Sequence, residues 1–506
     1  MQETGAADWL ERGRAQMLRG QPEAALATFE AGCAAHPGSA ELRVALAGLL
    51  WQARRSPDAE RHLREVLDAQ PGDAGAAFLL ARILREQGRM LGVEATLRAL
   101  FAQPQSLATL LHALDLLADC ERVEAASELA ERALAGGEGD ARLHAYAGMF
   151  ALQVGEFDRA HAHYARALDL DERAVEWQAP YGLASSRRHE AADDADFDRL
   201  QRLAQRPGLS PAAQASIAFG LGKAFDDIGD VEQAVAQFRR GNALVAASTR
   251  FDAKAWRRMV SAKLDAKPAP ALKVERDDFV PVFVIGMPRS GTTLVADWLA
   301  RHPTVCNRGE SNWIARLAGE LGPGGRGGHA SLVHVAHTYV QQTRQDDSDA
   351  RWFIDKQPLN VLHVDLIASL FPNARLVVCR RSPRDTALSI WMQYFAGHAQ
   401  DFAYDFAHIE AATNGCARLL DAARRRHPSL LREVRYEAFV ADPVGETQAL
   451  AEWIGLPAHD WSAARAGPRV ISTSSAWQAR QPVHTRSIGR WQAYASQVPE
   501  LLRFDP

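Results

Sequence analysis

The chain has 506 residues, which is too long for one ordinary hydrophobic core, so we expect two or three domains. It carries 58 Lys and Arg residues against 62 Asp and Glu residues, and its formal net charge is −4. A chain without a general basic excess does not attract nucleic acid or an anionic membrane surface, so any site for a polyanion must be local.

The sequence contains no recognisable signal peptide or membrane span, and its cysteines show no pairing pattern. Charged residues interrupt the N-terminal region, and no later apolar run reaches the ~18 to 20 residues that a transmembrane helix needs. The five cysteines are scattered and form no C-x-x-C pair, which indicates neither a disulfide framework nor a zinc site. We therefore expect a cytoplasmic protein without membrane insertion, nucleic-acid partner or metal.

Residues 7–248 are rich in Ala, Leu, Arg and Glu and show helical periodicity that is broken at regular intervals. One unit carries the residues of the tetratricopeptide pattern in their relative places: Trp9, Gly13, Ala25, Phe29 and Pro37. Ala59 and Pro71 repeat two of them about 34 residues later, which is the repeat length of that family. The small residues would let paired helices approach closely, with Phe29 filling the gap and Pro37 ending the second helix.

Weaker copies of the pattern follow along the chain. They carry Gly148, Ala160, Tyr164 and Ala167, and then Gly222, Phe225, Ala234 and Phe238. The segment 185–211 breaks the period, so we expect five to seven repeats, with a non-repeating helical bundle as the alternative. Residues 249–279 are charged and interrupted by proline, which is typical of a connector.

From residue 280 to 506 short β-rich runs alternate with helical stretches. This alternation predicts a central parallel sheet covered by helices, an α/β domain. The expected fold class is therefore an α-helical tetratricopeptide solenoid followed by an α/β domain with a P-loop-like turn.

The turn is the segment GMPRSGTTL, residues 286–294, which follows the first apolar run of this domain. Gly286 and Gly291 have the spacing of a phosphate-binding P-loop, but Thr292 stands at the lysine position. Backbone N–H groups and the helix dipole can still hold an anion there, and Arg289 adds a cation. Because the lysine that contacts the β- and γ-phosphates is missing, a phosphate or sulfate ester is favoured over an ordinary nucleoside triphosphate.

The segment PRSGTTL, residues 288–294, resembles the sulfotransferase loop for the 5′-phosphosulfate of 3′-phosphoadenosine 5′-phosphosulfate (PAPS). Arg381 and Ser389 have the spacing of the family's 3′-phosphate element. The tyrosylprotein sulfotransferase branch is most similar, since Glu310 follows the HPTV segment as the catalytic base does there. The resemblance implies catalytic roles for Glu310, Lys356, Arg289 and Ser475. It implies contacts to PAPS from Arg289, Ser290, Gly291, Thr292, Thr293, Leu294, Arg381, Ser389, Tyr436, Ser475 and Arg490.

The implied chemistry is in-line sulfuryl transfer to a hydroxyl, which needs no metal. Glu310 would accept the proton of the acceptor hydroxyl, while Arg289, Lys356 and Ser475 would stabilise the leaving phosphate. A purely structural role is the alternative for Glu310, as a salt-bridge partner of Arg308 or Arg316.

Two departures from the tyrosylprotein branch leave the acceptor open. Gln393 stands where that branch has an arginine near the nucleotide, and Asn312 replaces an arginine that serves acidic acceptor peptides. We expect a tyrosine of a peptide or protein that is recruited by the concave groove of the repeats. The alternatives are sulfation of a carbohydrate, lipid or small alcohol, and a repeat scaffold with a non-catalytic nucleotide domain.

Overall fold

The computed structural model describes residues 5–137, 139–191, 194–273, 277–322, 328–395, 397–462 and 483–504. The chain divides into two compact units. The first consists of residues 1–129 with 344–347, and the second of residues 130–343 with 348–506.

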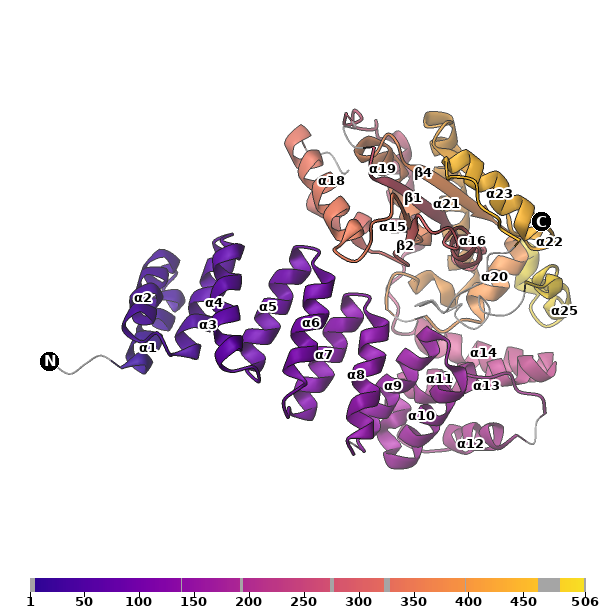
Figure 1. Cartoon of the computed structure of the whole chain (residues 1–506). Coiled ribbons are helices and arrows are strands. Elements are labelled where there is room, and N and C mark those ends of the chain that lie inside the picture. Colours follow the sequence, from indigo (N-terminus) through magenta and orange to yellow (C-terminus); the bar gives the residue numbers. More distant parts are fainter. Residues whose placement is uncertain are drawn as a thin grey trace. The chain divides into compact units, whose positions relative to one another are not determined.

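The first unit is built from helices joined by short turns (Figure 1). A Cβ atom added to Gly13 would lie 2.3 Å from Cε1 of Phe29, which confirms that this pair of helices packs through a glycine and an aromatic ring. Ser39, Asp73 and Ser106 cap three of the helices through their side-chain oxygens. The helices are α1 (Ala6–Leu18), α2 (Pro22–Ala35), α3 (Ala40–Gln52), α4 (Ser56–Ala69), α5 (Ala74–Glu86), α6 (Met90–Leu100), α7 (Leu107–Asp119) and α8 (Val123–Ala135), the last of which continues into the second unit.

The second unit begins with further helices of the same kind. A Cβ atom on Gly148 would lie 3.1 Å from the ring of Tyr164, and one on Gly222 would lie 2.8 Å from the ring of Phe238. The helical elements are α9 (Ala141–Val154), α10 (Phe157–Leu170), η1 (Glu172–Trp177), α11 (Ala179–Ser185), α12 (Ala195–Ala204), α13 (Pro211–Ile228), α14 (Val231–Ala246) and α15 (Ala253–Asp265). Helix α15 lies within the stretch 249–279 that the sequence analysis describes as a connector.

A five-stranded parallel sheet forms the centre of the C-terminal domain, in the order β2-β3-β1-β4-β5. The strands are β1 (Val280–Gly286), β2 (Val305–Asn307), β3 (Trp352–Asp355), β4 (Arg375–Arg380) and β5 (Leu431–Arg435). The prediction of a helical tetratricopeptide-like region followed by a parallel α/β domain is thus confirmed. The chain runs first to one side of β1 and then to the other, which makes the end of β1 the topological switch point where ligands of such sheets collect.

Side chains alternate between the two faces of the sheet, as the pleat requires. Phe283 and Ile285 of β1 pack on one face, against α17 (Trp313–Glu320), α18 (His329–Arg344), α19 (Val364–Leu370) and α21 (Phe406–Arg426). Val282 and Val284 pack on the other face, against α16 (Thr292–Leu299), α22 (Tyr436–Ala441) and α23 (Pro443–Ile454). Both faces of β1 are therefore buried, and its polar loop emerges only at the end of the strand.

A third hydrophobic cluster joins the helices of the second unit to the α/β domain. Phe219 and Phe238 of α13 and α14 share a core with Trp391 of α20 (Pro383–Trp391) and with Tyr404. The Asn242 side chain donates a hydrogen bond of 2.9 Å to the Trp391 carbonyl. Burial of several aromatic rings at this junction makes the last helices of the array part of one compact body with the sheet.

In the part of the chain that the structure describes, none of the helices has the length and apolar content needed to span a bilayer.

Candidate functional site

The carboxyl ends of the five parallel strands bring the predicted site residues to one edge of the sheet. In the spatial order of the strands, Glu310 follows β2, Lys356 follows β3, Arg289 follows β1, Arg381 follows β4 and Tyr436 follows β5. Residues separated by more than a hundred positions in sequence thus share one rim because each lies within about three residues of the end of a strand.

The loop after β1 has a backbone that only certain residues adopt without strain. Gly286 and Gly291 have φ values of 151° and 98°, and Arg289 has a φ of 69° although it carries a side chain. A Cβ atom on Gly286 would lie 2.5 Å from the Cys379 carbonyl oxygen. Ser290 is 2 % exposed, and its Oγ has no hydrogen-bond partner among the described residues. A buried hydroxyl without a partner is costly, and an anionic ligand in this loop would satisfy it.

Arg289 is held beside two other residues of the predicted donor site. Its Nε donates to Ser389 Oγ at 3.0 Å, and its carbonyl accepts a hydrogen bond of 3.1 Å from Nη1 of Arg381. Burial and the neighbouring Arg381 guanidinium lower the pKa of Arg289 from 12.5 to about 10. Two partly buried cations side by side favour a bound anion, which would offset both the burial and the repulsion.

Arg381 packs over an aromatic ring at the same rim. Its guanidinium carbon lies 4.8 Å from the ring centroid of Tyr436, and its Nη2 donates to the Ser487 carbonyl at 2.7 Å. Burial lowers the pKa of Arg381 as well. Arg380 turns the other way, toward Glu433 and Asp421, so alternation along β4 directs only one of the two arginines to the site.

Glu310 and Lys356 form an ion pair at the ends of β2 and β3. Lys356 Nζ donates to Glu310 Oε1 at 2.5 Å, and the Lys356 backbone N–H donates to the Gly309 carbonyl at 2.8 Å. The lysine side chain is only 2 % exposed, whereas the glutamate side chain is 32 % exposed. The two arginines considered as partners of Glu310 interact elsewhere, since Arg308 donates to the Thr343 carbonyl and Arg316 lies 3.9 Å from Glu320.

The remaining predicted residues have different surroundings. Thr292 is buried in the first turn of α16, and Thr293 and Leu294 follow it there. Arg490 forms an ion pair with Asp226 of α13, a carboxylate that also accepts a hydrogen bond from the Tyr494 hydroxyl. Burial alone would lower the pKa of Arg490, but Asp226 and Tyr494 raise it. Ser475, predicted as a catalytic and PAPS-contacting residue, lies outside the described residues.

A cavity of about 520 Å³ is lined on one side by the loop after β1 and on the other by helices α9, α11 and α13. Its lining includes Arg289, Glu310 and Ser389 from the α/β domain, and Tyr181 and Lys223 from α11 and α13. Every lining residue belongs to the second unit. No local sequence pattern indicates that residues near 181 and 223 lie beside a loop near 289, so the helical side of this cavity could not be predicted.

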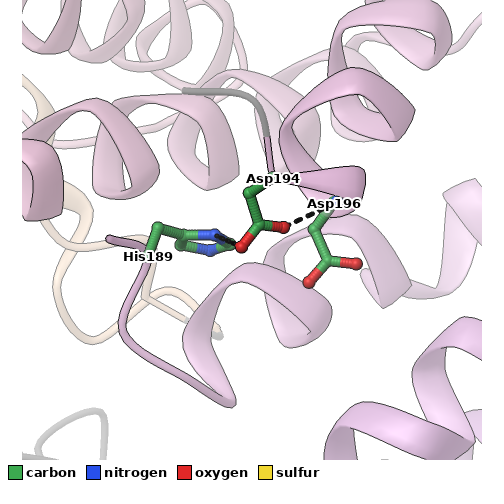
Figure 2. Close-up of side chains that lie close together, drawn as sticks. All are labelled: His189, Asp194 and Asp196. Atoms are coloured by element: carbon green, nitrogen blue, oxygen red, sulfur yellow. Dashed lines mark hydrogen bonds and ion pairs between the residues drawn. The ribbon is translucent and has the colours of Figure 1, made fainter. Parts of the chain in front are cut away.

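A separate cluster of His189, Asp194 and Asp196 has ligand-type atoms within 4.8 Å of one another. Figure 2 shows the Asp194 carboxylate facing the His189 ring, with Asp196 on the other side of Asp194. Arg187 forms ion pairs with both carboxylates, and His161 lies 2.7 Å from Asp196. A guanidinium therefore already supplies the positive charge that the two carboxylates require, and the cluster is an ion-pair network that fastens the segment where the repeat pattern breaks.

Comparisons with known proteins match two separate parts of the chain. Residues 281–460 match the model of the sulfotransferase family, and residues 6–49 match the model of a tetratricopeptide repeat. The chain combines tetratricopeptide repeats with a sulfotransferase domain. Proteins of the sulfotransferase family in general use PAPS as the sulfuryl donor.

Several proteins are similar to parts of the chain. An uncharacterized protein of Aquifex aeolicus is 25% identical over 335 residues, which are 62% of this chain and 44% of that protein, so the chain spans less than half of this relative. The sulfotransferase domain of the Synechococcus olefin synthase is 20% identical, and the match covers 47% of this chain and 100% of that domain, with a TM-score of 0.34. A tetratricopeptide repeat protein from Parabacteroides merdae is 13% identical, with 47% of this chain and 93% of that chain covered and a TM-score of 0.27.

Proposed function

We propose that the sulfotransferase domain moves the sulfuryl group of PAPS to the phenolic hydroxyl of a tyrosine in a peptide or protein. The observation that carries this proposal is that Glu310, paired with the buried Lys356, lines the same cavity as Arg289 of the donor loop. A proton acceptor and fixed positive charge thus lie together beside a loop built for an anion, which is what transfer to a hydroxyl requires.

The described residues fit such a donor. The partnerless hydroxyl of Ser290 and the N-terminal turn of α16 suit its 5′-phosphosulfate. Arg381 and Ser389 suit its 3′-phosphate, and the Tyr436 ring, which already stacks under Arg381, borders the same rim. The lowered pKa values of Arg289 and Arg381 support this assignment, because a bound anion stabilises the charged form of each guanidinium.

The chemistry divides among three side chains. Glu310 accepts the proton of the acceptor hydroxyl as the acceptor oxygen forms its bond to sulfur. The bond between sulfur and the bridging oxygen of the donor breaks, and the electron pair goes to the leaving 3′-phosphoadenosine 5′-phosphate. Lys356 and Arg289 stabilise the negative charge that develops on that phosphate.

A phenol suits this site better than an aliphatic alcohol. Carboxylates are weak bases, and a tyrosine hydroxyl with an ordinary pKa near 10 loses its proton far more readily than an alcohol does. A carboxylate base is therefore best matched to a phenolic acceptor. Aromatic residues in the cavity, among them Tyr181, Tyr394 and Phe395, offer apolar surface to a ring.

The proposal is tested with ³⁵S-labelled PAPS and a series of acceptors that includes tyrosine peptides, simple sugars and aliphatic alcohols. We expect label on the tyrosine hydroxyl, and we expect the Arg381→Ala variant to bind 3′-phosphoadenosine 5′-phosphate more weakly in calorimetry. Labelling of alcohols in preference to phenols would contradict the acceptor class, and failure of the unsubstituted protein to bind the nucleotide would indicate a non-catalytic scaffold.

A further inference from the structure

We propose that helices α9, α11 and α13 form one wall of the active site and bind an uncharged peptide segment that flanks the target tyrosine. This inference rests on the proposed function, because it concerns the acceptor of that same reaction. It assigns the last repeats a direct part in substrate selection, in addition to any recruitment by the rest of the array.

The wall belongs to the cavity that contains Glu310. Met149, Leu152 and Gln153 of α9 and Tyr181 of α11 line this cavity together with the donor loop. An acceptor whose hydroxyl reaches Glu310 therefore lies against side chains of the helical array.

Direct contacts hold the wall in place against the sulfotransferase domain. Gln393 donates through its side-chain amide to the Tyr181 hydroxyl, and the Tyr181 and Tyr394 rings meet edge to face at 5.6 Å. Asp226 of α13 pairs with Arg490 from the C-terminal segment. Because these contacts add to the shared core around Phe219, the wall is preorganised, and binding an acceptor there costs little ordering entropy.

The charged groups of the wall are already engaged within the protein. Lys223 Nζ donates to Asp227 at 2.6 Å and also to the Arg187 carbonyl, while Asp226 interacts with Arg490 and Tyr494. A charged acceptor side chain would have to break these pairs or leave its own charge desolvated. The structure thus favours an acceptor segment without charged side chains next to the tyrosine, in line with Asn312 at a position where the tyrosylprotein branch has an arginine.

The uncharged lining suits a peptide backbone. The side-chain amides of Gln178 on the helical side and of Gln400 on the opposite side have donors and acceptors that match backbone N–H and C=O groups. Met149 adds a flexible apolar surface that adapts to differing side chains. We therefore infer an extended peptide segment, rather than a lipid or sugar, as the occupant.

The test compares two acceptors of the intact chain, a neutral peptide with one central tyrosine and the small phenol N-acetyltyrosine amide. The variant Leu152→Glu places a carboxylate in the wall, and Gln153→Ala shortens a second side chain that lines it. We expect each to lower the ratio of peptide to small-phenol kcat/KM, by about tenfold for Leu152→Glu, which corresponds to about 1.4 kcal/mol.

The matched control is Leu170→Glu on α10, an exposed leucine (37%) that does not line the cavity, for which the ratio stays at the value of the unsubstituted protein. If both acceptors are sulfated and neither wall variant changes the ratio, the inference is wrong and the proposed function stands. If 3′-phosphoadenosine 5′-phosphate binds but neither phenol is sulfated, both are wrong.

Discussion

The two members of the Glu310–Lys356 ion pair differ in burial, so we expect their substitutions to change the stability of the protein by different amounts. Lys356 is 2 % exposed and Glu310 is 32 % exposed, with 2.5 Å between Nζ and Oε1. Replacing the carboxylate in Glu310→Gln leaves a buried ammonium facing a neutral amide. Replacing the ammonium in Lys356→Met instead leaves a carboxylate that water can reach, and puts an apolar side chain in the buried position.

The expected losses of stability for the two variants follow from this difference in burial. Glu310→Gln should lower the free energy of unfolding by about 2 kcal/mol, the range seen when a buried polar group loses a partner. Lys356→Met should change it by less than about 1 kcal/mol, since swapping a buried ion for an apolar residue is often close to neutral. Both variants should reduce sulfuryl transfer by about 100-fold or more, because one removes the base and the other a fixed cation.

Thermal unfolding measures the stability difference, and for a unit as large as the second one about 2 kcal/mol corresponds to roughly 2 to 3 °C in Tm. Glu320→Gln on α17 serves as a matched control, because its side chain is 49 % exposed and its only described ion pair is long, 3.9 Å to Arg316. If Lys356→Met destabilised the protein as much as Glu310→Gln, the lysine would not be the buried member of the pair and the reasoning would fail.

Two further predictions concern packing and pH. Gly182→Ala should lower Tm, because the added Cβ would lie 2.3 Å from Cζ of the buried Tyr164 ring and overpacking costs about 1 to 3 kcal/mol. Gly48→Ala is the control: its Cβ meets open space inside α3, so this variant should raise Tm slightly. Burial and Lys263 lower the pKa of His363 from 6.5 to about 4. The unfolded imidazole therefore takes up a proton first, and stability should fall as pH drops from about 7 toward 4, by about 2 kcal/mol between pH 7 and 5. Chemical denaturation of the His363→Gln variant checks this, since equal acid sensitivity in the variant would contradict the assignment.

Local sequence patterns predicted the elements that depend on local physics. The glycine spacing of the loop at Gly286 and Gly291 follows from two backbone conformations with positive φ. The contact of Gly13 with Phe29 follows from the repeat pattern, and the parallel sheet follows from alternating apolar runs. The grouping of Glu310 and Lys356 at one rim could also be expected, because each follows a strand of a parallel sheet.

Long-range pairing could not be predicted in this way. Arg308 and Arg316, close to Glu310 in sequence, were natural alternative partners, but the structure pairs the glutamate with Lys356 across the ends of β2 and β3. Gln393 marked a departure from the tyrosylprotein pattern without revealing its contact to Tyr181. The pairing of Arg490 with Asp226 depends on how α13 packs against the C-terminal segment, and a single sequence contains no local signal for that packing.

The most direct test of the account is acceptor-dependent release of 3′-phosphoadenosine 5′-phosphate from PAPS in the presence of a neutral tyrosine peptide, with the product analysed by mass spectrometry. We expect a sulfated tyrosine with the unsubstituted protein, and for Glu310→Gln intact nucleotide binding with sulfation reduced by about 100-fold or more. Full transfer activity in Glu310→Gln would contradict the central claim that this carboxylate accepts the proton of the acceptor.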